Sequence, residues 1–154
     1  MNTKIKLMTQ AAIIAAMYAA LTILLAPISY GEVQVRVAEM LTVLSFFTPA
    51  AIPGLFVGCL ISNIVGGYGL LDIIFGSLAT LIAAYLTRKM PNKILAPLPP
   101  VIVNAVIVGI MLSYVLKLPF WIPMGFVGLG QLISCYVLGY PLMLVLERYK
   151  TKLF

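Results

Sequence analysis

Charged residues are scarce in this sequence, and histidine is missing. Only 9% of the 154 residues are Asp, Glu, Lys or Arg, against about 25% in a typical soluble domain. The absence of histidine removes the commonest metal ligand and every triad that uses an imidazole base. No G-x-x-x-x-G-K-[ST] loop, nucleophile elbow or metal-ligand spacing occurs. We therefore predict a protein that is not an enzyme and needs no cofactor.

Cysteine is also rare. Cys59 and Cys135 both lie within apolar runs, where we expect them to be small packing residues. Two such residues do not make a disulfide framework.

Apolar residues, by contrast, make up 63% of the chain, and lipid is the solvent that suits so much apolar surface. The net charge is +6, and all basic residues except Arg36 and Lys117 fall in three short clusters. The clusters are Lys4 and Lys6; Arg88, Lys89 and Lys93; and Arg148, Lys150 and Lys152. Basic clusters beside apolar spans follow the positive-inside rule, whereas nucleic-acid binding needs a broad basic face. The sequence predicts a multi-pass protein of the cell membrane with both termini in the cytoplasm.

The apolar runs predict several membrane-spanning helices, each of about 20 residues. The first run, Leu7–Ser29, is too long for the core of a signal peptide and is expected to be a retained helix. Both ends and the 88–93 cluster are basic, so all three are expected on the cytoplasmic side of the membrane. The chain must then cross the membrane an even number of times. We predict an all-α membrane protein, one domain over 1–154, with helices at about 7–29, 38–48, 54–66, 70–87, 96–116 and 122–147. Four spans with a re-entrant hairpin over 40–71 are the alternative.

Turn residues divide the middle of the chain. Pro49, Pro53 and Gly54 favour a break between the second and third helices, and Gly66-Gly-Tyr-Gly69 marks a second turn. In the six-helix arrangement this second turn faces the outside, as does the loop over 30–38.

Small residues form two adjacent ridges on the first helix. The ridges are Ala11, Ala15 and Ala19, and Ala12, Ala16 and Ala20. Small residues four apart allow another helix to approach closely. The ridges could pack within this chain or dock a second membrane subunit, and their spacing does not decide between the two.

The loop over 30–38 alternates polar and apolar residues. Glu32, Gln34 and Arg36 alternate with valines, a period of two that is typical of an extended segment. We predict a lid over the outer mouth of the bundle. The alternative is an ordinary solvated loop in which Glu32 and Arg36 pair loosely.

Few polar residues occur within the predicted helices. Asn63 and Asp72 flank the outer turn, Glu39 begins a helix on the same side, and Asn104 and Gln131 lie deeper. Such residues usually face a bundle interior or a cavity, because an Asp at the bilayer centre costs about 2.5–3.5 kcal/mol. Singly, each could hold helices together. As a cluster, they predict a polar pocket open to the outside.

Aromatic residues also gather at the outer end, either as an interfacial belt or as a stacking wall for a flat ligand. Together the candidate ligand-binding residues are Tyr30, Glu32, Arg36, Glu39, Asn63, Tyr68, Asp72, Asn104, Trp121 and Gln131. An outer pocket without a nucleotide motor is typical of a capture subunit or of a carrier driven by an ion gradient. A purely structural membrane subunit is the third possibility.

Several longer strings are shared with one family. They are Tyr30-Gly31, Arg36-Val-Ala-Glu39, Phe46-Phe-Thr-Pro49, Ala51-Ile-Pro-Gly54, Gly69-Leu-Leu-Asp-Ile-Ile-Phe-Gly76, Leu98-Pro-Pro-Val-Ile-Val-Asn104 and Leu118-Pro-Phe-Trp121. With them, the chain resembles the QueT family of substrate-binding (S) subunits of energy-coupling-factor (ECF) vitamin transporters over nearly its whole length. The alanine ridges resemble the docking motif that such subunits carry on their first helix.

The resemblance implies a six-helix S-component bundle, capture of a queuosine precursor (queuine or a related 7-deazaguanine), and no nucleic-acid partner. It also implies a partner module of one transmembrane coupling protein and two ATPases. A carboxylate from Glu39 or Asp72 would accept the ring N–H and the exocyclic amine, and aromatic residues would stack on the ring. The alternative function is a small ion-coupled transporter of a nucleobase-like or vitamin-like solute.

Overall fold

The computed structural model describes residues 3–31, 34–67 and 69–153, and the regular structure in these ranges is entirely helical. In chain order the helices are α1 (Thr3–Leu24), α2 (Ala26–Ser29), η1 (Val37–Val43), α3 (Leu44–Phe47), α4 (Ala51–Gly66), η2 (Asp72–Gly76), α5 (Ser77–Arg88), α6 (Leu98–Leu116), α7 (Trp121–Leu132), η3 (Ile133–Gly139) and α8 (Tyr140–Leu153). The η1 segment is a 3₁₀ helix, and η2 and η3 are π-helical segments continuous with their neighbours. The predicted all-α class is confirmed.

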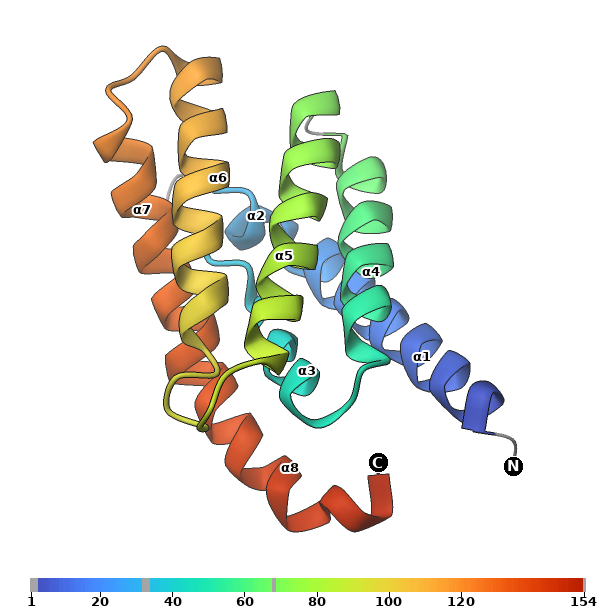
Figure 1. Ribbon diagram of the computed structural model, residues 1–154. Coiled ribbons are helices and arrows are strands. Elements are labelled where there is room, and N and C mark those ends of the chain that lie inside the picture. Colours follow the sequence, from blue (N-terminus) through green and yellow to red (C-terminus); the bar gives the residue numbers. More distant parts are fainter. Residues whose placement is uncertain (1–2, 32–33, 68, 154) are drawn as a thin grey trace.

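The helices form an up-and-down bundle. Both termini lie at one end, together with the loop between α5 and α6, as Figure 1 shows. The turn between α4 and η2 and the loop between α6 and α7 lie at the opposite end. Helix α1 packs mainly on α4, and α6 packs on both α5 and α7.

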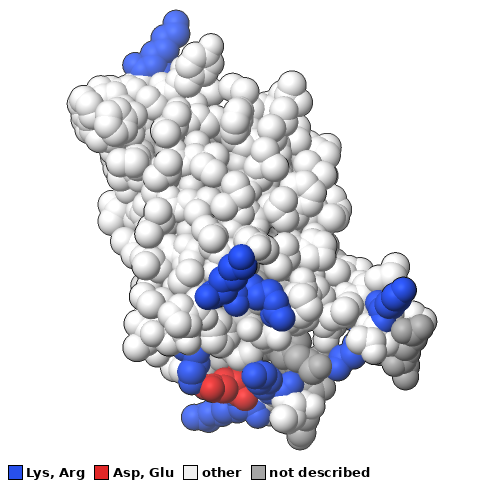
Figure 2. Space-filling model, in the orientation of Figure 1, with Lys and Arg blue, Asp and Glu red and all other residues white. Residues whose placement is uncertain are grey.

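The surface and the helix lengths are those of a membrane protein. Within the described residues, three helices are long and apolar enough to cross a bilayer, namely Thr3–Leu24, Leu98–Leu116 and Trp121–Thr151. Large apolar side chains are exposed along all three. On the face drawn in Figure 2, most basic side chains lie toward the end that holds the termini, and a broad uncharged surface separates them from one at the other end. The number of crossings and their direction stay predictions.

Prolines account for most differences between the predicted and observed helix boundaries. Helix α4 begins at Ala51 and takes Pro53 into its first turn, where the missing N–H costs no intrahelical bond. The predicted break between helices therefore shrinks to residues 48–50. The predicted helix over 7–29 is interrupted at Leu25, and α2 begins at Ala26 with Pro27 in its first turn.

Other boundaries shift because the helix geometry changes. The predicted helix over 38–48 is mostly 3₁₀, with α3 as a single closing turn. The predicted helix over 122–147 continues to Leu153, since the wide π turn of η3 does not end it.

Helices α1 and α4 approach closely because glycine removes the side chains at their contact. A Cβ atom at Gly54 would lie 2.7 Å from the carbonyl oxygen of Ala11, and one at Gly58 would lie 2.7 Å from that of Ala15. Glycines four apart on α4 thus face alanines four apart on α1, a small-xxx-small contact within the chain.

This contact corrects half of the predicted docking surface. Ala15 and Ala19 are only 7% and 8% exposed, and Ala11 lies against α4, so their ridge is used inside the bundle. The neighbouring ridge is exposed, and its residues are Ala12, Ala16 and Ala20. Adjacent helix positions are rotated by about 100°, which separates the two ridges.

Replacing Gly58 with alanine should destabilise the protein by about 1–3 kcal/mol, because the added methyl group overlaps the α1 backbone. Thermal unfolding in detergent measures the effect. Gly125→Ala is the matched control, since no heavy atom lies within 4 Å of its added Cβ. Equal unfolding midpoints for the two variants would contradict the close α1–α4 contact.

Candidate functional site

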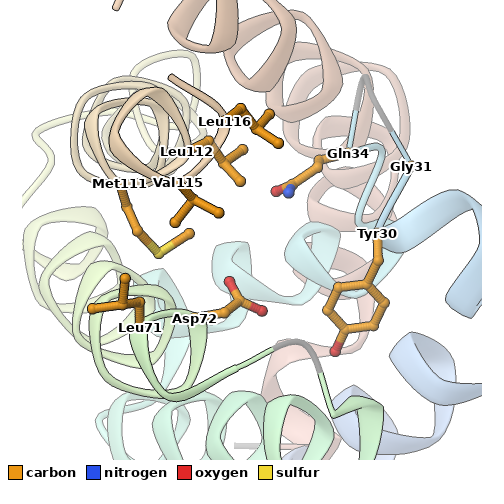
Figure 3. Close-up of a pocket in the computed structure, with 9 residues that line it drawn as sticks. All are labelled: Tyr30, Gly31, Gln34, Leu71, Asp72, Met111, Leu112, Val115 and Leu116. Carbon is orange, nitrogen blue, oxygen red and sulfur yellow. The ribbon is translucent and has the colours of Figure 1, made fainter. Parts of the chain in front are cut away.

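A pocket of about 280 Å³ lies beneath the turn that joins α4 to η2. Its lining residues are Tyr30, Gly31, Gln34, Leu71, Asp72, Met111, Leu112, Val115 and Leu116. The α6 residues form an apolar wall, and Tyr30 lies across the pocket from them, as Figure 3 shows. The volume is close to the lower limit of about 300 Å³ for drug-sized ligands, so the pocket suits a small ring system.

Asp72 supplies the charge in this pocket. It opens the π-helical segment η2, an irregularity that is frequent at functional sites. The residue is only 6% exposed, and its carboxylate points into the space between Tyr30 and α6 (Figure 3). Neither carboxylate oxygen has a hydrogen-bond donor among the described residues. A buried acceptor without a donor is expensive and is a marker of function.

Arg36 lies behind Asp72 and balances its charge. The guanidinium Nη2 is 3.8 Å from Asp72 Oδ2, and the two side chains are almost fully buried. Its Nη1 donates to the Cys59 sulfur at 3.6 Å, and the guanidinium carbon lies 5.1 Å from the centre of the Tyr30 ring. Cys59 is therefore a polar contact as well as a packing residue.

The burial of Arg36 corrects the predicted extended lid. Gln34 has a φ of +47°, and its N–H donates to the Gly31 carbonyl, so the chain turns here instead of extending. The turn sends Arg36 inward, with 4% of its surface exposed. Its ion-pair partner among the described residues is Asp72. Glu32, with which Arg36 would pair in the alternative solvated loop, lies outside the described residues.

A short hydrogen-bond chain ties the pocket rim together. The Tyr30 hydroxyl lies 3.1 Å from both the Ser62 carbonyl oxygen and Asn63 Oδ1 and donates to them. Asn63 Nδ2 in turn donates to the Asp72 backbone carbonyl at 3.1 Å. One residue of α4, Asn63, thus contacts both Tyr30 and the backbone of Asp72.

Glu39 belongs to a separate, deeper layer. It is fully buried and does not line the pocket. The Tyr18 hydroxyl donates to Glu39 Oε1 at 2.5 Å, and Thr80 Oγ1 lies 3.1 Å from the same oxygen. Glu39 thereby joins α1, η1 and α5 at the centre of the bundle.

The remaining predicted residues lie outside the pocket. Asn104 approaches the Glu39 carboxyl group and donates to the Pro100 carbonyl of its own helix at 2.9 Å. Gln131 is buried and accepts from Cys135 Sγ at 3.5 Å. Asn104 therefore links α6 to η1, whereas the contact of Gln131 stays within the continuous α7–η3 helix.

The aromatic candidates divide as well. Tyr30 lines the pocket, whereas Trp121 is 61% exposed at the start of α7 and packs edge-on against Phe120. The structure therefore places Trp121 on the surface, the position of an interfacial belt residue, and not in a stacking wall. Tyr68 lies outside the described residues.

Several residues of the site escaped prediction. Met111 and Val115 form the apolar wall, yet nothing distinguishes them from other apolar residues of α6. Tyr18 and Thr80 both contact the Glu39 carboxylate. The sequence could have predicted them, because a hydroxyl within an apolar span needs a hydrogen-bond partner.

The family model described as QueT transporter matches residues 8–148 of the chain. The curated protein named Queuosine precursor transporter QueT, from Lactococcus lactis subsp. cremoris (strain MG1363), is 44% identical over 73 residues. That match spans 46% of this chain and 43% of the relative, less than half of either. No solved structure matches the chain.

Replacing Tyr18 with phenylalanine should lower the free energy of unfolding by about 1.5–3 kcal/mol, because it removes a donor from a buried carboxylate. Thermal unfolding in detergent is the measurement. Tyr114→Phe makes the same chemical change at a side chain that is 80% exposed and should have little effect. If both variants unfold like the parent protein, the Tyr18–Glu39 bond does not hold the bundle.

Proposed function

The chain belongs to the QueT transporter family, and we propose that it is the substrate-capture subunit of an ECF-type importer. Its ligand is a queuosine precursor, that is, queuine or a related 7-deazaguanine, taken from outside the cell. The proposal agrees with the name of the Lactococcus relative, a queuosine precursor transporter.

The observation that carries the proposal is the position and lining of the pocket. It lies near the end of the bundle opposite the termini and combines one buried carboxylate with a tyrosine and an apolar wall. The carboxylate can accept from the N–H donors at the edge of a flat heterocycle, and the tyrosine and the apolar wall can contact its faces. The basic clusters are near the termini or in the loop between α5 and α6, so the positive-inside rule places the pocket on the outer side.

The same rule supports six crossings with both ends in the cytoplasm. The spans are α1, η1 with α3, α4, η2 with α5, α6, and α7 continued through α8, all within one domain over 1–154. The second and third are short, at Val37–Phe47 and Ala51–Gly66, and a short span needs other parts of the protein around its ends.

Energy for uptake comes from other chains in this proposal. The sequence contains no phosphate-binding loop, so a transmembrane coupling protein and two ATPases would drive transport. The exposed ridge of Ala12, Ala16 and Ala20 is where the coupling protein would dock, because small residues let its helix approach closely.

The purified protein should bind a 7-deazaguanine base one to one in detergent, without ATP or an ion gradient. Isothermal titration calorimetry measures this. No binding heat with any 7-deazaguanine, on folded protein, would contradict a capture role. Uptake into liposomes by the protein alone, driven by a pH gradient, would instead support the ion-coupled carrier.

Replacing Ala16 with leucine should abolish most uptake in cells that contain the partner module and leave ligand binding by the purified protein unchanged. The reason is that the new side chain projects from the exposed ridge, away from the pocket. Ala15→Leu is the contrasting variant, since its side chain meets α4 and should lower stability. Full uptake by Ala16→Leu would rule out docking through this ridge.

A further inference from the structure

We infer that Asp72, and not Glu39, determines the specificity of the pocket by accepting two parallel N–H donors from the neutral ring edge of a guanine-type base. The inference rests on the proposed capture function and assigns the group that reads the ligand.

The first argument is the state of the Asp72 oxygens. Both are buried, and neither receives a hydrogen bond from any described residue. An ionised carboxylate only accepts, and its two oxygens match two donors held side by side. Because the carboxylate points into the pocket, a bound ring edge is in position to supply both donors (Figure 3).

The second argument is the way in which Arg36 balances the charge. At 3.8 Å its nitrogen is close enough for ion pairing and too far for a hydrogen bond. The guanidinium is held instead by the Cys59 sulfur and the Tyr30 ring. Arg36 thus neutralises Asp72 and leaves the accepting positions of the carboxylate open, which makes Arg36 a positioning residue.

The third argument concerns the charge of the ligand. Asp72 is the charged residue among those that line the pocket, and the pair with Arg36 sums to zero. A phosphate would meet the Asp72 carboxylate directly, and a cationic ring edge would compete with Arg36. A neutral ring edge with two donors, such as N–H beside an exocyclic amine, can bind Asp72 without disturbing its ion pair with Arg36.

Glu39 does not fit this role. Its Oε1 already receives the Tyr18 hydroxyl and lies beside Thr80. Its Oε2 has no donor among the described residues, but Glu39 is fully buried and does not line the pocket, so a ligand there does not reach it. The two buried carboxylates therefore divide their tasks: Asp72 faces the ligand and Glu39 holds the helices.

The pocket walls fix the orientation of the ring. Tyr30 lies on one side of Asp72, and Met111 and Val115 lie on the other (Figure 3). A planar base between these walls presents its edge, and not its face, to the carboxylate. Stacking on Tyr30 is the expected aromatic contact.

The test compares three ligands by calorimetry: 7-deazaguanine, 7-deazahypoxanthine, which lacks the exocyclic amine, and 7-deazaadenine. The wild-type protein should prefer 7-deazaguanine over 7-deazahypoxanthine by about 5- to 150-fold, the range of a bidentate base contact. Asp72→Asn offers one acceptor beside one donor, which matches the adenine-type edge. Its preference should therefore shift from 7-deazaguanine toward 7-deazaadenine, a change that loss of structure cannot produce.

Two control variants separate the possible causes. Glu147→Gln removes a carboxylate from the exposed pair with Lys93 and should leave all three affinities unchanged. Glu39→Gln should lower stability and keep the order of preference. A change in that order on Glu39→Gln, with Asp72→Asn unaffected, would overturn the assignment.

The outcomes also distinguish this inference from the proposed function. If the wild-type protein binds none of the three bases, the capture function fails. If it binds 7-deazaguanine and 7-deazahypoxanthine equally, capture stands and the Asp72 contact is refuted. This second comparison uses only wild-type protein, so it can refute the Asp72 contact even if Asp72→Asn does not fold.

Discussion

The buried charge of Arg36 constrains the arrangement of the whole pocket. A guanidinium inside an apolar bundle needs partners, because a charge at the bilayer centre costs several kcal/mol. The structure provides Asp72 as counter-ion, Cys59 as acceptor and Tyr30 as a ring face. These groups come from η2, α4 and the end of α2, so balancing one charge brings three parts of the chain together. Removing one partner of such a pair would leave a buried charge uncompensated.

The deeper layer depends on backbone packing. A Cβ at Gly58 would lie 2.8 Å from the Cβ of Tyr18, so the missing side chain lets Tyr18 sit directly on α4. From there its hydroxyl reaches Glu39. A glycine on α4 thus allows the hydrogen bond between Tyr18 and Glu39. The close contact of α1 and α4 therefore also positions the donor for the buried Glu39 carboxylate.

The two layers use the same residue types for different purposes. Glu39 Oε1 accepts from Tyr18 and Thr80, whereas Glu39 Oε2 and both Asp72 oxygens have no donor among the described residues. A buried acceptor without a donor is costly, so a ligand that supplies donors gains free energy there. Asp72 lines the pocket and Glu39 does not, and this difference in position separates the binding group from the structural one.

The sequence alone determined the membrane class, the all-α fold and the family. Hydropathy, basic clusters and motif strings are local properties, and no neighbour is needed to interpret them. The tertiary structure decided which alanine ridge is buried, that Arg36 turns inward to Asp72, and that Met111 lines the site. Each of these depends on how far a helix is rotated about its axis and on which helix faces it. Helices α1, α4 and α6 carry apolar residues on all sides. Their sequences therefore contain little information about that rotation, and the packing of the bundle sets it.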